Sequence, residues 1–169
     1  MEVRPPVVDD AREMRDAWAR AWRAGHGDVL SEDALAAVAI KADEEDVARW
    51  RERIETWRDR MLVADDGRLV GYVHVRVTDT KPFVGDDEAG LKELYVRPDR
   101  WGEGIGGTLL ERGIETLPDG VTAVRPETLE GNDRAAGFHE TRSFRRVGER
   151  TVEVAGETYP ALVYRRPLE

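Results

Sequence analysis

Apolar residues recur at helical spacing along the first third of the chain. After Asp10, three of them fall on one helical face, namely Met14, Trp18 and Trp22. Asp10 and Glu13 have the spacing of a capping box, in which two side chains bond to the first backbone N–H groups of a helix. The pattern therefore predicts a long helix that begins just after residue 10.

Two further stretches have the same period. A short one begins at Ser31, and a longer one covers residues 44–60 behind Asp43, an expected N-cap. The longer stretch carries four apolar residues on one face: Val47, Trp50, Ile54 and Trp57. We expect these tryptophans to belong to the core, because large aromatic side chains bury the most apolar surface.

The period then changes from helical to alternating. Residues 61–78 are expected to form a hairpin about Asp66-Gly67, since Asp-Gly between apolar runs is a strong hairpin signal. In the second strand, Tyr72 and His74 share one face and Val73 lies on the other. A first short strand is expected at residues 2–4.

The stretch after residue 90 combines the signals of a strand, a glycine loop and a helix. A polar loop over residues 81–90 is expected to precede an apolar strand over residues 91–96, which ends at Pro98. Four glycines follow, at positions 102, 104, 106 and 107, and a helical apolar period begins at Ile105. A glycine loop that opens a helix presents bare N–H groups at the positive end of the helix dipole, an arrangement that holds phosphate.

Three other interpretations of these glycines are disfavoured. Gly102, Gly104 and Gly107 spell G-x-G-x-x-G, but a dinucleotide-binding fold needs most of its parallel sheet after that motif, and too little of the chain follows. No lysine follows the glycines as it does in nucleoside triphosphate loops. A loop without any ligand is disfavoured because each glycine in a helix costs about 1 kcal/mol.

The last third of the chain predicts further strands around one helix. A fifth strand is expected at residues 121–124, before Pro126. Asn132 is an expected N-cap of the next helix, and strands over residues 144–150 and 159–166 complete the chain.

Length, composition and charge limit the class of protein. The 169 residues suit one domain, residues 1–169, and no apolar run is long enough for a membrane span or a signal segment, so a cytoplasmic protein is expected. There is no cysteine, and the three histidines are scattered, which disfavours a metal site. The net charge of −9 argues against nucleic acid as a partner. The acidity serves solubility or attracts a cationic amine.

Two motifs resemble the GNAT acetyltransferase superfamily. Residues 101–106, WGEGIG, match its coenzyme A loop, Q/R-x-x-G-x-G/A, with Trp101 where Gln or Arg is usual. The second motif, N-x-x-A-x-x-F/L-Y-x-x-x-G-F, is matched by Asn132, Ala135, Phe138 and Phe144. His139 stands where the family has a tyrosine beside the coenzyme sulfur, and Ser143 stands where it has glycine.

The resemblance implies a mixed α/β (α+β) fold. Its central sheet would have about seven strands, with helices on both faces and with the fourth and fifth strands splayed apart. It implies acetyl-CoA as cosubstrate and no metal. It assigns coenzyme binding to Leu94, Tyr95, Val96, Trp101, Gly102, Glu103, Gly104, Ile105, Gly106, Gly107, Thr108, Asn132 and Ala135. Backbone N–H groups near residues 94–96 would polarise the thioester carbonyl.

Three residues are candidates for proton transfer. Glu93 lies on the strand before the loop, on the opposite face from Leu94 and Val96, and is the leading candidate base. His74 on the neighbouring strand is a second candidate. His139 is a candidate acid, which as an imidazolium could protonate the departing thiolate. For each residue a purely structural role is the competing interpretation.

Two functions of different class follow. The first is an acetyl-CoA-dependent N-acetyltransferase that moves an acetyl group directly to a primary amine of a small molecule or protein. The second is a coenzyme-A-binding sensor or partner-binding module with little or no turnover, suggested by the missing tyrosine. The sequence identifies neither the acceptor amine nor the oligomeric state, and it leaves a homodimer open.

Overall fold

The computed structural model of the protein describes all of residues 1–169, and its contacts group them into two compact units. The first unit comprises residues 1–24, 39–75 and 93–117. The second comprises residues 25–38, 76–92 and 118–169. Each unit therefore combines segments that are far apart in the sequence.

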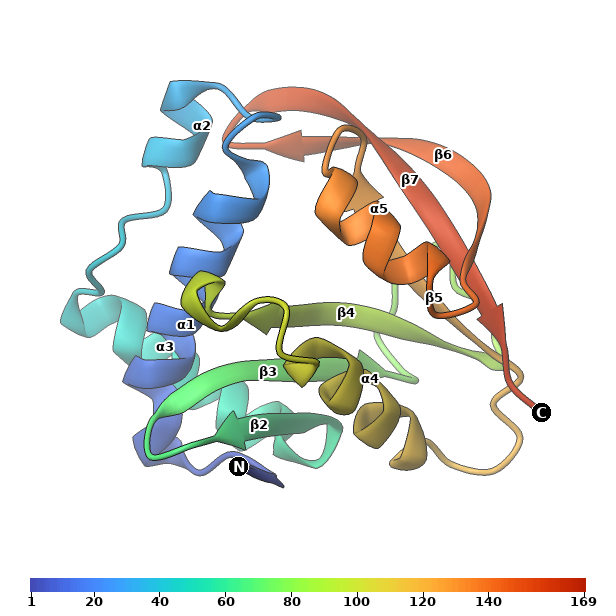
Figure 1. Ribbon diagram of the computed structural model, residues 1–169, viewed down its shortest axis with the longest axis horizontal. Helices are drawn as coiled ribbons and strands as arrows, with labels where there is room; N and C mark the ends of the chain where they lie inside the picture. Colours follow the sequence, from blue (N-terminus) through green and yellow to red (C-terminus); the bar gives the residue numbers. More distant parts are fainter. The chain divides into compact units, whose positions relative to one another are not determined.

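Seven strands and five α-helices make up the fold (Figure 1). The strands are β1 (Glu2–Arg4), β2 (Met61–Asp65), β3 (Leu69–Arg76), β4 (Glu88–Val96), β5 (Ala123–Leu129), β6 (Arg145–Val154) and β7 (Glu157–Pro167). The helices are α1 (Ala11–His26), α2 (Glu32–Ala36), α3 (Glu44–Trp57), α4 (Ile105–Glu115) and α5 (Asp133–Glu140). The strand order is β1-β2-β3-β4-β5-β7-β6, and β4 pairs with β5 in parallel. The predicted mixed α/β fold is confirmed.

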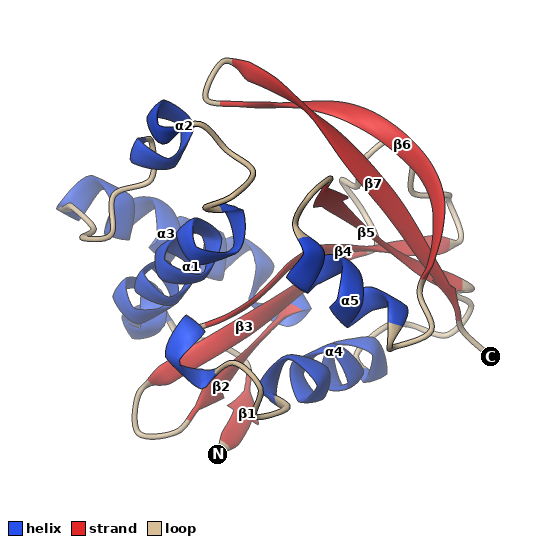
Figure 2. Ribbon diagram, turned by 45° about the horizontal axis from the view of Figure 1, so that its top comes forward, coloured by secondary structure: helices blue, strands red, loops and turns tan.

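In the first unit, helices cover both faces of β2 and β3. Strand β3 is buried along almost its whole length, as expected of a central strand. On one face, Val73 packs against α4, where a side chain at Gly113 would approach its methyl group to 3.3 Å. On the other face, Tyr72 packs with Met14 of α1 and Ile54 of α3. Figures 1 and 2 both show α1 and α3 side by side.

In the second unit, β6 and β7 form a long antiparallel hairpin that continues β5 (Figure 2). Its buried apolar residues come mainly from β5 and β7, and they include Val124, Ala161, Val163 and Tyr164. Strand β6 is largely exposed, because it is the edge strand of the sheet. The amide of Ser31, just before α2, donates to the hydroxyl oxygen of Tyr159 at 3.1 Å.

Strand β4 begins three residues earlier than the sequence predicts. Residues 88–90 were expected in the polar loop, but they pair with β5 and are buried. The charge of Glu88 is the reason the pattern misleads, because its carboxylate accepts hydrogen bonds from Arg125 at 2.7 Å and Arg165 at 2.8 Å. A paired carboxylate can be buried where an isolated one cannot.

Strand β5 lies later than predicted and runs through Pro126 to Leu129. The expected strand at residues 121–124 is therefore wrong at both ends. The parallel ladder with β4 stops at Leu91 and Pro126, although β4 continues to Val96. Proline has no N–H to donate, so it suits the point where a ladder ends. This is the predicted divergence of the fourth and fifth strands.

The predicted capping box of Asp10 and Glu13 does not form. The Asp10 carboxylate accepts from the backbone N–H of Val7 at 2.8 Å and from Arg4 at 2.8 Å, while Glu13 accepts from the N–H of Leu69 at 2.6 Å. Asp10 therefore bonds to the residues just before it, and only Glu13 has a partner that is distant in the sequence. None of the helices is both long and apolar enough to cross a membrane.

Candidate active site

The glycine loop joins the end of β4 to the start of α4, as predicted. Gly102 and Gly104 adopt φ angles of +84° and +82°, which residues with a side chain rarely adopt. The indole N–H of Trp101 donates to the carbonyl oxygen of Val96 at 2.7 Å. The Trp101 side chain therefore anchors the loop to the end of β4.

The N-terminus of α4 lacks the groups that normally satisfy a helix start. Side chains cap three other helices, through Ser31 for α2, Asp43 for α3 and Asn132 for α5. The N-cap of α4 is Gly104, which has no side chain to offer, and the first turn holds no acidic residue. Residues 102–104 are exposed. The geometry thus leaves backbone donors and a helix dipole available to an anion.

Glu93 of β4 lies in a cluster of polar and aromatic groups within the first unit. Its carboxylate pairs with the guanidinium of Arg53 from α3 and accepts a hydrogen bond from the Tyr72 hydroxyl at 3.0 Å. The Nδ1 atom of His74 lies 3.7 Å from the same carboxylate. The two candidate bases predicted from the sequence, Glu93 and His74, are therefore neighbours.

Opposing effects set the charge of Glu93. Burial by itself would raise its pKa, but the approach of His74 and the positive charge of Arg53 outweigh this and lower the pKa to about 2. Burial and the negative charge of Glu93 raise the pKa of Tyr72 well above its usual range. At neutral pH the pair consists of an ionised carboxylate and a neutral phenol that donates to it.

Arg53 and Tyr72 were not among the predicted site residues. Arg53 follows Trp50 by three residues and precedes Trp57 by four, so it lies on the apolar face of its helix. A charge on such a face needs a partner, and this was the available signal. The partner itself could not be named, because Glu93 is forty residues further along the chain.

His139 lies in the second unit, on α5, and is buried with 6% of its surface exposed. Its Nε2 atom is 3.2 Å from the hydroxyl oxygen of Thr128, and its Nδ1 atom is buried without a hydrogen-bond partner. The rings of Phe144 and Tyr164 lie 5.3 Å from the imidazole. Burial, with a smaller effect of Arg142, lowers the pKa of His139 to about 4. The imidazole is therefore neutral at pH 7, which disfavours the predicted imidazolium form.

The low pKa of His139 predicts a dependence of stability on pH. The unfolded chain takes up this proton near pH 6.5 and the folded chain only near pH 4, so stability is lost as the pH falls between these values. Between pH 7 and pH 5 the loss should be about 2 kcal/mol. Urea unfolding at both pH values should show this loss in the wild type and a smaller one in His139→Phe. Equal losses would mean that His139 titrates normally.

Ser143 adopts a φ of +69° at the position where the family motif has glycine. A left-handed backbone costs a residue with a side chain about 1–2 kcal/mol, and glycine avoids this cost. Glycine also has greater freedom in the unfolded chain, which offsets part of the gain. Ser143→Gly should therefore raise the unfolding free energy by about 1 kcal/mol. Chemical denaturation measures this, and an unchanged or lower midpoint would show that the serine hydroxyl is needed.

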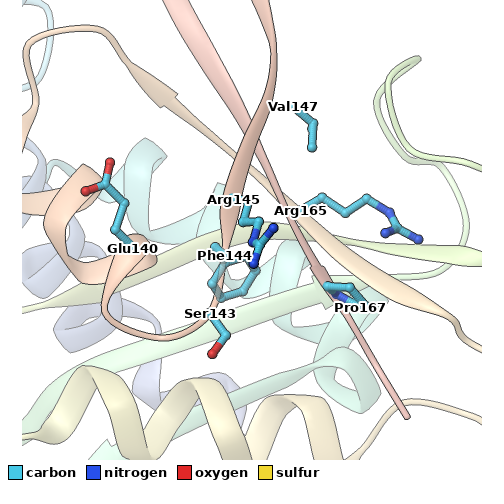
Figure 3. A pocket seen from close by; sticks show the side chains of 7 residues that line it. All are labelled: Glu140, Ser143, Phe144, Arg145, Val147, Arg165 and Pro167. Atoms are coloured by element: carbon cyan, nitrogen blue, oxygen red, sulfur yellow. The ribbon is translucent and has the colours of Figure 1, made fainter.

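Asn132 and Ala135 are the predicted coenzyme-binding residues of the second unit, and a hydrogen bond joins them. The Asn132 side-chain oxygen accepts from the N–H of Ala135 at 3.2 Å and caps α5. A cavity of about 630 Å³ lies elsewhere in this unit, between the end of α5 and the strands β6 and β7 (Figure 3). Ser143, Arg145 and Arg165 line it, and none of the predicted binding residues does. No group of His, Asp or Glu side chains could hold a metal ion.

The fold of GNAT acetyltransferases is a mixed sheet in which one parallel pair of strands diverges. A glycine loop joins the first strand of that pair to the helix that follows it. The family model of the acetyltransferase (GNAT) family matches residues 12–144, and the chain belongs to this family. The peptidyl-lysine N-acetyltransferase YjaB of Salmonella typhimurium is 29% identical over 128 residues, which are 69% of this chain and 86% of that protein.

Solved structures share the whole fold. A GCN5-related N-acetyltransferase from Rhodopseudomonas palustris matches with a TM-score of 0.74 and 22% identity, over 99% of this chain and 95% of that one. The PaiA N-acetyltransferase of Thermoplasma acidophilum, solved with coenzyme A, matches with a TM-score of 0.71 and 16% identity, over 99% and 98%. At these identities the likeness concerns the fold.

Proposed function

We propose that the protein is an acetyl-CoA-dependent N-acetyltransferase that acts on a primary amine. The observation that carries this proposal is the start of α4, where exposed glycines leave the first backbone N–H groups without a side-chain cap and the first turn without a carboxylate. These donors fit the pyrophosphate of coenzyme A. The coenzyme A bound to a relative of the same fold supports this choice over other phosphate-containing ligands.

The residues around the loop have distinct roles in this proposal. Gly102–Thr108 hold the pyrophosphate through backbone N–H groups, and Trp101 fixes the loop by its bond to the Val96 carbonyl. Acetyl-CoA supplies the acetyl group as a thioester. Strand β4 beyond Leu91 has no ladder partner in β5, which leaves the backbone near Leu94 available to polarise a carbonyl group. Asn132 and Ala135 stay predictions from the family motif.

Glu93 is the proposed general base, because it is an ionised carboxylate on the same strand. Its task is to take a proton from the acceptor nitrogen. His74 lies beside the Glu93 carboxylate and is the second candidate. His139, which is neutral, can act only as a neutral donor to the departing thiolate through one ring nitrogen.

The proposed acceptor is an alkylamine such as a lysine side chain. The name of the Salmonella relative, a peptidyl-lysine N-acetyltransferase, supports a protein lysine as one such acceptor. A small-molecule amine is the other form of the same chemistry. The proposed site of action is the cytoplasm, where acetyl-CoA is available.

Calorimetric titration with acetyl-CoA, combined with a thiol-release assay over a panel of lysine peptides and small amines, tests the proposal. We expect saturable binding and thiol release that depends on the amine. An absence of acetyl-CoA binding would contradict the proposal. Binding without release over the whole panel would favour the alternative, a coenzyme-A-binding sensor, for which the replacement of the family tyrosine by His139 is the supporting observation.

A further inference from the structure

The groups around the Arg53 guanidinium would also suit a cation from another molecule. Its guanidinium lies 4.3 Å from the centre of the Trp50 ring and pairs with the Glu93 carboxylate. The hydroxyl of Tyr72 completes the arrangement by donating to Glu93 at 3.0 Å. An aromatic face combined with a carboxylate is the chemistry that binds alkylammonium groups.

The cation is the most exposed part of this arrangement, and the groups around it are more deeply buried. Tyr72 is fully buried, Trp50 is 6% exposed, and the Glu93 side chain is 14% exposed. The Arg53 side chain, by contrast, is 27% exposed and reaches the cluster from α3 on a long flexible stem. Arg53 can therefore swing into solvent through side-chain rotation, whereas the groups that receive it stay in place.

We propose that Arg53 is an internal placeholder for the acceptor, and that a primary alkylammonium group displaces its guanidinium from Glu93 and Trp50. This inference rests on the proposed function, because it places the acceptor nitrogen beside the proposed base. It names the acceptor as a protonated primary amine on an alkyl chain that is slender enough to follow the path of the Arg53 stem.

The displacement also places a transferable proton beside the proposed base. The groups that face Glu93 are Arg53 from α3, Tyr72 and His74 from β3, and Tyr95 from β4. Burial is the largest influence on Glu93 and acts to raise its pKa, while His74 and Arg53 act against it. The ammonium that displaces Arg53 carries the same charge, so Glu93 stays ionised. Unlike a guanidinium, however, an alkylammonium can give up a proton, and the exchange places that proton beside the carboxylate.

Binding of n-butylammonium to the protein without coenzyme, followed by tryptophan fluorescence, tests the inference. In Arg53→Met the placeholder is gone, and we expect a dissociation constant at least tenfold lower than in the wild type. Arg51→Met is the matched control, because Arg51 is an exposed residue of the same helix and the change removes the same charge. Equal dissociation constants in all three proteins, or binding to none of them, would overturn the inference.

A second measurement needs no variant and covers the case in which Arg53→Met does not fold. In the wild type, saturating n-butylammonium should move the side-chain NMR signals of Arg53 to those of a solvent-exposed arginine. Binding that leaves these signals unchanged would overturn the inference. Neither measurement uses acetyl-CoA, so a protein that binds n-butylammonium as expected but never releases thiol would contradict the proposed function alone.

Discussion

Glu93→Gln is expected to lower kcat/KM for amine acetylation by about a hundredfold or more, the usual contribution of a positioned general base. The amide keeps the shape of the side chain but cannot accept the proton. The affinity for acetyl-CoA should change little, because the glycine loop is intact. Steady-state kinetics and calorimetry on the same preparations measure the two quantities separately.

Glu127→Gln provides the matched control for this change. Glu127 is a half-buried carboxylate of β5 with a side-chain exposure of 16%, close to the 14% of Glu93, and it pairs with Arg150 at 2.8 Å. Its loss should cost a similar amount of stability but leave kcat/KM near the wild-type value. If a folded Glu93→Gln protein turns over at the wild-type rate, Glu93 is a structural ion-pair partner and another group is the base.

Gly104→Val is expected to weaken acetyl-CoA binding tenfold or more, which is about 1.4 kcal/mol. Gly104 has a φ of +82°, where a β-branched residue is strained, so the backbone that forms the proposed anion site must shift. Calorimetric titration of the folded variant with acetyl-CoA measures the effect.

The control for backbone strain is Gly156→Val in the turn between β6 and β7. Gly156 also has a φ of +82°, and a Cβ atom at either glycine would meet no atom within 4 Å. The two variants should therefore lose similar stability, while only Gly104→Val loses coenzyme affinity. Comparable affinity in both would refute the assignment of the pyrophosphate to this loop.

The order of the elements and the position of the glycine loop follow from the sequence, because the signals that carry them are local. Helical and alternating periods separate residues 44–60 from residues 61–78, and each has only one burial pattern that fits. Glycines at 102 and 104 mark the backbone turn for a similar reason, since few other residues adopt its φ angles. The second family motif was found in the same way, from Asn132 onward.

The ends of β4 and β5 could not be obtained in this way. Glu88 is polar by itself and becomes a buried strand residue only because Arg125 and Arg165 neutralise it. Pro126 normally ends a strand, but it is tolerated where the parallel ladder stops. In both cases a partner that is distant in the sequence reverses the local preference.

The sequence by itself thus determined the class of fold, the position of the glycine loop and the candidacy of Glu93, His74 and His139. Only the tertiary structure decided the state of these groups. It pairs Glu93 with Arg53, forty residues away, and so makes a strongly ionised carboxylate out of a buried one. It buries His139 and so keeps the ring neutral. The physical reason is that a pKa depends on solvent exclusion and on the distance between charges, and these exist only once the chain has folded.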